Sequence, residues 1–429
     1  MADGMRKQAL ILTAAGGATR AAGFVMRLLF ARLMGAEALG VMELASSASM
    51  LALTPVTAGI PTAMSRLTAN RPACDQPEVL RAGKALVTRT ALILLPLMLV
   101  LSPLLARLMG DARSLPSLVA MAPCILLLGL CSVYSGYCYG RDETRRAAIN
   151  ECVEQGVRFT LAAALLLALR HSAAAVTAAL PGLAESVAAL VVVLLFRRAF
   201  PLPRRKSPPS AALTQQLFRL AAPTTLSRLC TTAMRTLSAV LLPVCLRRSG
   251  LSAAAATAQF GLLNGMALPL MMLPSIATGA ISMVGTPAVS RRENAPQLLR
   301  ATARRLRLAG IAVGLAASVG LFLLADVIGA GLYHHPALSP LIRLMSPLAL
   351  LFGSHQVQSG LIAGLGLQRK ALTGSILSSA LTLGLTAWLA PIPRLRLFGA
   401  ALALLAGQLV NLLWSTALLS RRLRTPGEP

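Results

Sequence analysis

The chain has 429 residues, of which 56% are hydrophobic and only 13% are charged, about half the charged fraction of an ordinary soluble domain. Its 41 Lys and Arg residues far outnumber its 14 Asp and Glu residues, but they lie in short clusters between long apolar stretches. This distribution excludes a soluble nucleic-acid-binding protein and is typical of helices that cross a bilayer.

The first apolar run follows Arg6 and Lys7 and reaches about residue 33, which is too long for the core of a signal peptide. We therefore expect it to be retained as a membrane span. Apolar runs and their breakers predict an all-α polytopic membrane protein with about twelve spans. In chain order these are 9–33, 41–64, 85–106, 116–140, 147–169, 173–196, 214–246, 256–285, 306–325, 340–364, 371–390 and 399–419.

The distribution of basic residues predicts the orientation of these spans. With the N-terminus in the cytoplasm, the external loops hold 7 of the 41 Lys and Arg residues, and the cytoplasmic segments hold more than three times as many. Because cytoplasmic loops of membrane proteins are enriched in Lys and Arg, both termini are expected to be cytoplasmic.

A basic, proline-rich interruption at Arg197–Ser210 divides the spans into two sets of six. We expect a six-helix lobe at 1–200, a cytoplasmic linker at 201–213 and a second lobe at 214–429. Four patterns recur in the same order in both halves, which predicts two pseudo-symmetric lobes around a central cleft, as in a transporter. They are Thr19-Arg20 and Met26-Arg27 with Ser227-Arg228 and Met234-Arg235, Gly59-Ile-Pro61 with Gly285-Thr-Pro287, Gly136 and Gly140 with Gly360 and Gly364, and Arg146-Ala147 with Lys370-Ala371.

Four arginines inside the spans are the candidate binding residues. Arg20 and Arg27 are two helical turns apart, and Arg228 and Arg235 repeat this spacing. A charge within the bilayer costs about 2.5–3.5 kcal/mol on insertion scales, and guanidinium groups suit oxyanions, so the set predicts a diphosphate site in the cleft. Alternatively, Arg27 and Arg235 extend to the outer headgroups, which is harder for the mid-span pair.

The fifth and sixth spans carry acidic residues. Glu154 and Arg158 are four residues apart in the favourable order, so we expect an intrahelical ion pair in preference to a substrate or ion site. Glu185 has no basic residue within one turn, and would either bind a coupling cation or neutralise an arginine; both alternatives stay open. His355 is expected to make a polar contact by hydrogen bonding.

Three cysteines, Cys124, Cys131 and Cys138, recur at seven-residue intervals and are expected to pack as small apolar residues. The sequence contains no Walker loop, zinc motif or nucleophile elbow. We therefore expect no enzyme activity, no cofactor and no metal.

Several segments between about residues 9 and 415 are specific in combination. They are Leu33-Met-Gly-Ala-Glu-Ala-Leu-Gly40, Thr57-Ala-Gly-Ile-Pro-Thr-Ala-Met-Ser-Arg66, Gly136-Tyr-Cys-Tyr-Gly140-Arg, Glu154-Gln-Gly-Val-Arg158, Ala222-Pro-Thr-Thr-Leu-Ser-Arg228, and Gly265-Met-Ala-Leu-Pro-Leu270 with Pro287-Ala-Val-Ser290. Together they resemble the stage V sporulation protein B family of the multidrug/oligosaccharidyl-lipid/polysaccharide (MOP) exporter superfamily, which also contains the lipid II flippase MurJ.

The resemblance implies a monomeric flippase in the bacterial plasma membrane. Its substrate would be an undecaprenyl-diphosphate-linked saccharide for cell-wall, spore-cortex or polysaccharide assembly, with phospholipid and wall-synthesis enzymes as neighbours. Arginines of the first span are functional in related flippases, which fits Arg20 and Arg27. Two departures are that the family has fourteen spans, and that Ser238 stands where the family often has an Asp.

Two other functions remain as alternatives: a cation-coupled multidrug exporter of the same superfamily, and a non-transporting scaffold for wall synthesis. An excess of arginine within the membrane is unfavourable for an organic cation, which prefers carboxylates and aromatic rings, and only 4% of the residues are aromatic. A scaffold has no need of arginines in both halves.

Overall fold

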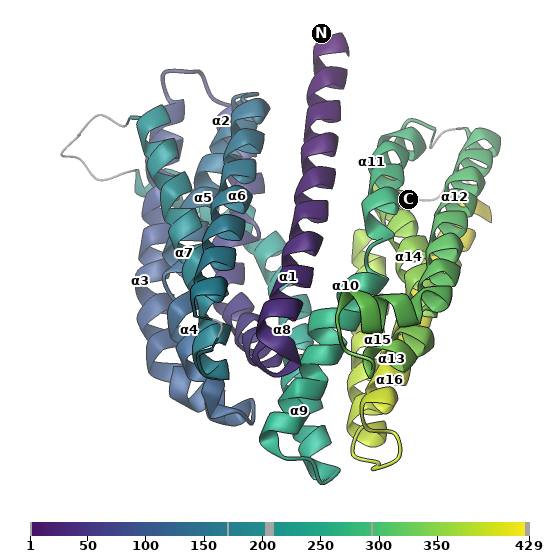
Figure 1. Cartoon of the computed structure of the whole chain (residues 1–429). Coiled ribbons are helices and arrows are strands. Elements are labelled where there is room, and N and C mark those ends of the chain that lie inside the picture. The colour runs from purple at the N-terminus through teal and green to yellow at the C-terminus, as the bar shows by residue number, and fades with distance from the viewer. Residues whose placement is uncertain (1, 170, 202–209, 293–294, 425–429) are drawn as a thin grey trace. The chain divides into compact units, whose positions relative to one another are not determined.

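The computed structural model describes residues 2–169, 171–201, 210–292 and 295–424, with side chains from residue 22 to residue 423. All regular elements in this part of the chain are helices (Figure 1). Each of the twelve predicted spans is largely helical, so the prediction of an all-α polytopic fold is confirmed.

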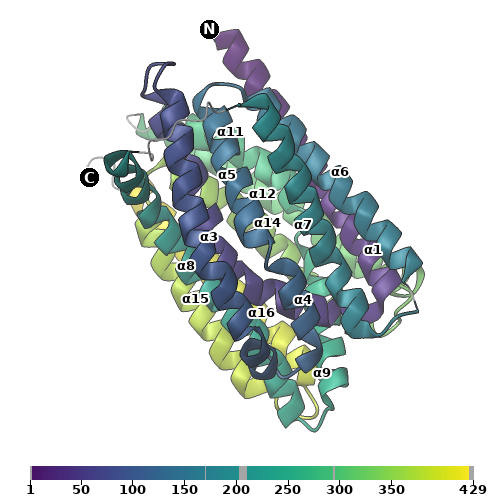
Figure 2. The same ribbon diagram turned by 90° about the vertical axis from the view of Figure 1, so that its left-hand side faces the viewer.

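The chain groups into two compact units, residues 1–240 and 241–429. The first unit contains α1 (Ala2–Thr57), α2 (Ile60–Ala69), α3 (Gln76–Leu108), a 3-10 turn (Ala112–Ser114), α4 (Leu115–Met121), α5 (Cys124–Gly140), α6 (Thr144–Ala168), α7 (Ala174–Ala199) and most of α8 (Ala211–Arg248). Figure 2 shows α3, α5, α7 and α6 lying side by side in this unit, and α1 packs against α3 to α7.

α1 consists of two helices that meet at Gly35, whose φ of 73° and ψ of 173° are not helical. Arg27 and Glu43 lie eight residues before and after this glycine, and their side chains are 3.1 Å apart. In one continuous helix the two residues would be about 24 Å apart along the axis. The first two predicted spans therefore form a hairpin that turns at Gly35, where a positive φ favours glycine.

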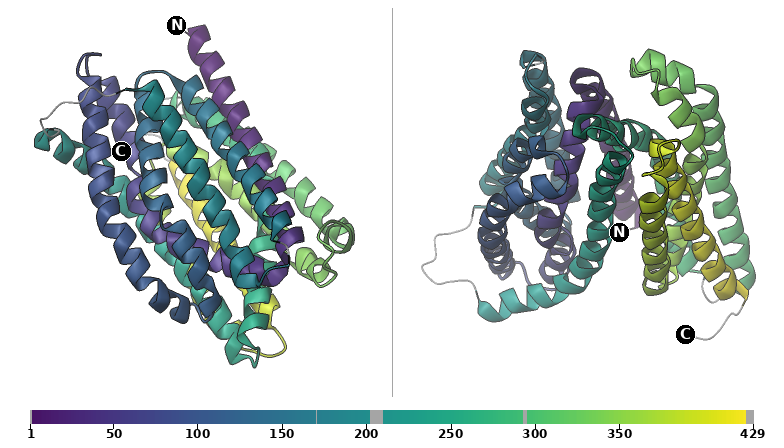
Figure 3. Two further views of the ribbon diagram at one scale, coloured as in Figure 1. Left: turned by 60° about the vertical axis from the view of Figure 1, so that its left-hand side comes forward. Right: turned by 90° about the horizontal axis from the view of Figure 1, so that it is seen from below.

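The second unit contains the end of α8 and ten further helical segments or turns. These are α9 (Ala253–Phe260), a π-helical turn (Gly261–Ala267), α10 (Leu268–Met271), α11 (Ser275–Ser290), α12 (Pro296–Leu323), a second π-helical turn (Val327–Leu332), α13 (Leu338–Met345), α14 (Pro347–Gly364), α15 (Gln368–Leu389) and α16 (Arg396–Arg424). α14 packs against α11, α12 and α16, and α15 packs against α16. The right-hand view of Figure 3 shows these green-to-yellow helices grouped together.

Seven helices in the described part of the chain are long and apolar enough to cross a membrane. The segments Ala253–Met271 and Ser275–Ser290, bent by 49° at their junction, make an eighth crossing if they are counted as one span. Other predicted spans are more polar, because α6 carries Glu151, Glu154 and Arg158, and α14 carries His355 and two glutamines. The contacts of Arg158 and His355 are described below.

Two glycines of α5 allow it to pack closely on α2. A Cβ atom on Gly136 of α5 would lie 2.5 Å from the carbonyl oxygen of Pro61 in α2, and one on Gly140 would lie 2.6 Å from that of Ser65. Since real Cβ atoms do not approach other atoms below 3.0 Å, only glycine fits at either position. The two helices are therefore packed backbone to backbone.

In the second unit, α14 packs on α11 as α5 packs on α2, but the residues that make the contact are not those predicted from the repeated Gly-x-Pro pattern. Cβ atoms on Gly360 and Gly364 of α14 would lie 3.0 Å and 2.5 Å from the carbonyl oxygens of Ser282 and Thr286 in α11. These two residues follow Pro61 and Ser65 by 221 positions, not by the 226 positions that separate the two Gly-x-Pro patterns. The glycine pairs therefore correspond, whereas the predicted equivalence of the Gly-x-Pro patterns is wrong by more than one helical turn.

The boundary between the two compact units lies within α8. The first part of α8 belongs to the first unit because it packs on α1, where Thr236 Oγ1 donates to the carbonyl oxygen of Ser47 at 2.7 Å. The lobe boundary at 201–213 stays a prediction, since residues 202–209 lie outside the described residues.

Candidate functional site

The first part of α8 lies along the second half of the α1 hairpin. Besides the bond from Thr236 to Ser47, the hydroxyl groups of Thr54 and Thr232 are 3.3 Å apart. Ser47 in turn donates to the carbonyl oxygen of Glu43 at 2.8 Å. Arg235 is therefore next to a residue that contacts α1 one helical turn from Glu43, the partner of Arg27.

The guanidinium group of Arg27 is the partly neutralised cation of this region. Its Nη1 donates to Oε1 of Glu43 at 3.1 Å across the hairpin. The Arg27 side chain is 43% exposed, but that of Glu43 is only 14% exposed. The cation can therefore be reached from outside the helices, whereas its counterion is largely covered.

Two further cations lie on α8. Arg228 and Arg235 are both exposed and two turns apart on a continuous helix. Among the described residues, no carboxylate lies within 4.0 Å of either guanidinium group. The fourth predicted residue, Arg20, is in α1, but its side chain lies outside the described residues.

Arg158 of α6 forms its ion pair with α7. Its Nη1 donates to Oε1 of Glu185 at 3.0 Å, and its Nη2 donates to Gln155 on its own helix. The side chains of Arg158 and Glu185 are 19% and 24% exposed, so the pair is mostly covered. The expected intrahelical pair with Glu154 is therefore wrong, because the packing of α6 on α7 supplies a nearer carboxylate than the same helix does. Of the two alternatives for Glu185, the structure shows a partner for an arginine.

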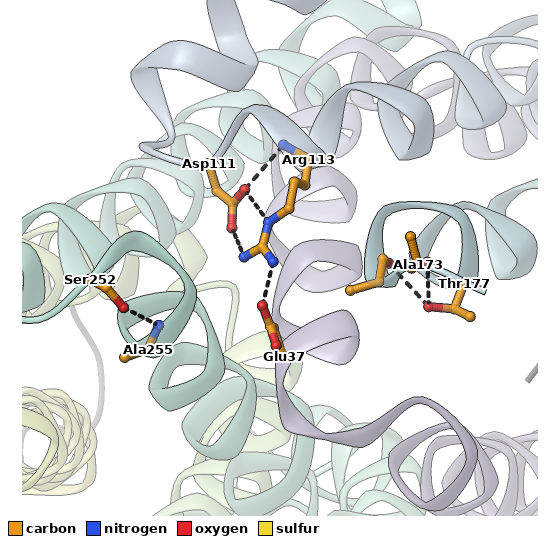
Figure 4. Close-up of polar contacts among 8 residues, drawn as sticks. Glu37, Asp111, Arg113, Ala173, Thr177, Ser252 and Ala255 are labelled. Atoms are coloured by element: carbon orange, nitrogen blue, oxygen red, sulfur yellow. Dashed lines mark hydrogen bonds and ion pairs between the residues drawn. The ribbon is translucent and has the colours of Figure 1, made fainter. Parts of the chain in front are cut away.

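An ion-pair network holds the turn of the α1 hairpin (Figure 4). Arg113 donates from Nε and Nη2 to the two carboxylate oxygens of Asp111, at 2.9 Å and 2.7 Å, and from Nη1 to Glu37. The side chain of Asp111 is only 3% exposed. The turn between α3 and α4 is thus joined to α1 two residues after Gly35.

His355 of α14 lies in a polar cluster with α16. Its ring nitrogens are 3.3 Å from Ser359, 3.4 Å from Asn411 and 3.4 Å from Ser415, which confirms the expected polar contact. Cys124, Cys131 and Cys138 are buried, as expected of packing residues. Within the described residues, no group of three His, Cys, Asp or Glu side chains could hold a metal ion.

Glu43 is the residue that the sequence analysis did not single out. The signal was available, because Glu43 is an acidic residue in the predicted span 41–64. Its role depends on the chain reversal at Gly35, which brings together residues that are sixteen positions apart.

The sequence of this chain matches one protein family and a related protein. The family model described as "Polysaccharide biosynthesis protein" matches residues 5–293. Stage V sporulation protein B of Bacillus subtilis (strain 168) is 29% identical over 432 residues, covering 97% of this chain and 83% of that protein.

Two solved structures show the same fold. An inward-facing multidrug resistance MATE family transporter of the MOP superfamily has a TM-score of 0.77 at 16% identity, over 95% of this chain and 96% of that one. The lipid II flippase MurJ in an inward closed conformation has a TM-score of 0.75 at 14% identity, over 96% and 89%. At these identities the likeness establishes the fold alone.

Proposed function

The chain belongs to the polysaccharide biosynthesis protein family and is a multi-pass protein of the bacterial plasma membrane with the MOP transporter fold, and from this premise we propose that it is a lipid-linked-saccharide flippase. The substrate is an undecaprenyl-diphosphate-linked saccharide, either lipid II-like or a polysaccharide repeat unit. The description of the family, "Polysaccharide biosynthesis protein", and the name of the lipid II flippase MurJ support this class of substrate.

The observation that carries the proposal is a pair of uncompensated arginines inside a membrane-spanning helix. Arg228 and Arg235 are exposed, and no carboxylate of the described residues neutralises them. At bilayer depth such cations cost about 2.5–3.5 kcal/mol each on insertion scales, so an anionic ligand would recover part of this cost. With Arg20 and Arg27 they form the proposed binding residues for the diphosphate, whose oxygens match guanidinium donors.

Alternating access driven by the membrane potential is the proposed mechanism. An inside-negative potential favours outward movement of an anion by about 2.3 kcal/mol per charge for each 100 mV. The pairing of Arg158 with Glu185 gives these two residues a charge-balancing role, and Glu154 remains the candidate for a coupling ion. Transport in liposomes that is indifferent both to the imposed potential and to Arg228 would contradict this mechanism.

The test of the substrate is native mass spectrometry of the full chain, gently purified from its membrane. The wild type is compared with a quadruple variant in which Arg20, Arg27, Arg228 and Arg235 are replaced by Gln. The matched control carries four Arg→Gln substitutions at exposed positions outside the predicted spans: Arg145, Arg198, Arg304 and Arg305.

We expect a polyprenyl-diphosphate saccharide on the wild type and on the control, and none on the quadruple variant. An adduct of equal strength on all three proteins would remove the four arginines from the proposed site. Absence of the adduct from the wild type, with export of organic cations from cells, would instead support the multidrug-exporter alternative.

A further inference from the structure

We propose that Glu43 makes the anion site selective for a diphosphate over the singly charged phosphates of ordinary membrane lipids. Glu43 is the counterion of Arg27 in this structure, and an anionic ligand that binds Arg27 must displace the Glu43 carboxylate. The inference rests on the proposed function, because it assigns the discriminating residue within the same site.

The ion pair between Arg27 and Glu43 rests on a single contact, so a competing anion can break it. One guanidinium nitrogen meets one carboxylate oxygen at 3.1 Å, so most of the five N–H donors of Arg27 stay available. The two residues lie at equal distances from the turn at Gly35, on opposite sides of the hairpin. Exchanging the counterion therefore requires a side-chain movement and no change of the hairpin.

The different exposure of the two side chains gives the exchange its direction. Arg27 is 43% exposed, and Glu43 is 14% exposed. An anion can therefore reach Arg27, whereas a cation is screened from Glu43 by the surrounding helices. The exchangeable partner is an anion that binds Arg27.

The ion pairs of Arg113 at the same turn differ from the pair of Arg27 and Glu43, because Arg113 has two carboxylate partners. Arg113 is bound at two carboxylate oxygens by the buried Asp111, in addition to its contact with Glu37. A ligand that displaced Glu37 would leave Arg113 with Asp111, so that pair carries no comparable site. Arg27 has no second carboxylate within ion-pair distance among the described residues.

Selectivity follows from the competition between Glu43 and the incoming ligand. A singly charged phosphodiester of a phospholipid offers about the same charge as the carboxylate that it must displace. A diphosphate offers more charge and more acceptor oxygens, and its length lets it extend toward Arg235, whose neighbour Thr236 contacts α1 at Ser47, one helical turn from Glu43. Glu43 therefore weakens the binding of abundant phospholipid headgroups to Arg27 more than it weakens the binding of the diphosphate.

The experiment measures the binding of three lipid probes to the full chain in nanodiscs: undecaprenyl diphosphate, phosphatidylglycerol and phosphatidylethanolamine. In Glu43→Gln, we expect the two phospholipids, whose phosphodiesters each carry one negative charge, to bind about three- to tenfold more tightly relative to the diphosphate, the range of a weak to moderate ion pair. Glu43→Asp keeps the charge and should retain most of the discrimination. Glu37→Gln, at the same hairpin, is the matched control and should leave it unchanged.

The possible outcomes separate this inference from the proposed function. Unchanged discrimination in a folded Glu43→Gln variant, with weaker binding of all three probes to Arg27→Gln, would overturn the role of Glu43 and leave the flippase proposal standing. Binding of no probe to the wild type, or binding that ignores Arg27, would overturn both. Thermal unfolding of each variant establishes that a loss of binding is not a loss of fold.

Discussion

Backbone contact between α2 and α5 can be tested by adding a single methyl group. In Gly136→Ala the new Cβ atom would lie 2.5 Å from the carbonyl oxygen of Pro61 and 2.7 Å from Cβ of Met64. The helices must separate by about 0.5 Å to reach the 3.0 Å limit and by about 0.9 Å to reach an ordinary 3.4 Å contact. Overpacking of this kind costs about 1–3 kcal/mol.

The same substitution at Gly156 of α6 is the matched control. A Cβ atom there meets no atom within 4 Å, so only the helix propensity of alanine acts, and it stabilises by up to about 1 kcal/mol. The difference between the two variants therefore isolates the steric cost. We expect Gly136→Ala to unfold about 1–3 kcal/mol more easily than Gly156→Ala.

Reversible unfolding of the two purified variants in mixed detergent micelles gives this difference from the midpoints and slopes of the transitions. Stabilities that agree within about 0.5 kcal/mol would refute the close backbone contact. Such agreement would also remove the basis for matching Gly136 and Gly140 with Gly360 and Gly364.

Three further outcomes are expected. Asp111→Asn should destabilise the protein by about 1–3 kcal/mol in thermal unfolding, because Asp111 is buried and accepts hydrogen bonds from the charged Arg113. The control is Glu143→Gln, which removes a more exposed ion pair with Arg146 and should cost less than about 1 kcal/mol. Arg158→Gln and Glu185→Gln should each destabilise by about 1–3 kcal/mol and the double variant by clearly less than their sum; additive effects would contradict the pair. In a variant with Cys152 and Cys230 replaced by Ala, an impermeant maleimide should label the exposed Cys74 only in inverted vesicles, and labelling in right-side-out vesicles would reverse the predicted orientation.

Local patterns of the sequence predict most of the fold. Long apolar runs suffice for the helices, because a span of about 20 apolar residues has few other structures open to it in a bilayer. The glycine pairs of α5 and α14 were also informative, since only small residues allow backbones to meet. The Gly-x-Pro pattern predicted the wrong residues to be equivalent in the two halves. Proline marks the start or a bend of a helix, whereas the close contacts are made by the backbone that lies opposite the glycines of α5 and α14.

The partners of the charged residues depend on tertiary packing and could not be predicted in the same way. Spacing along one helix suggested Glu154 for Arg158, but the partner is Glu185, 27 residues away on α7. Arg27 likewise finds Glu43 only because the chain reverses at Gly35. Periodicity identifies which residues share a helix face, but it does not identify the helix that this face will meet.

The pairing across Gly35 also bears on how the chain enters the membrane during synthesis. Released alone, the first span would place Arg27 in lipid, and the second would place Glu43 there, each at a cost of about 2.5–3.5 kcal/mol if it reached the bilayer centre. Joined as a hairpin, the two charges cancel before either meets the hydrocarbon. The translocon should therefore hold the first span until the second has emerged from the ribosome, and release both together as one insertion unit.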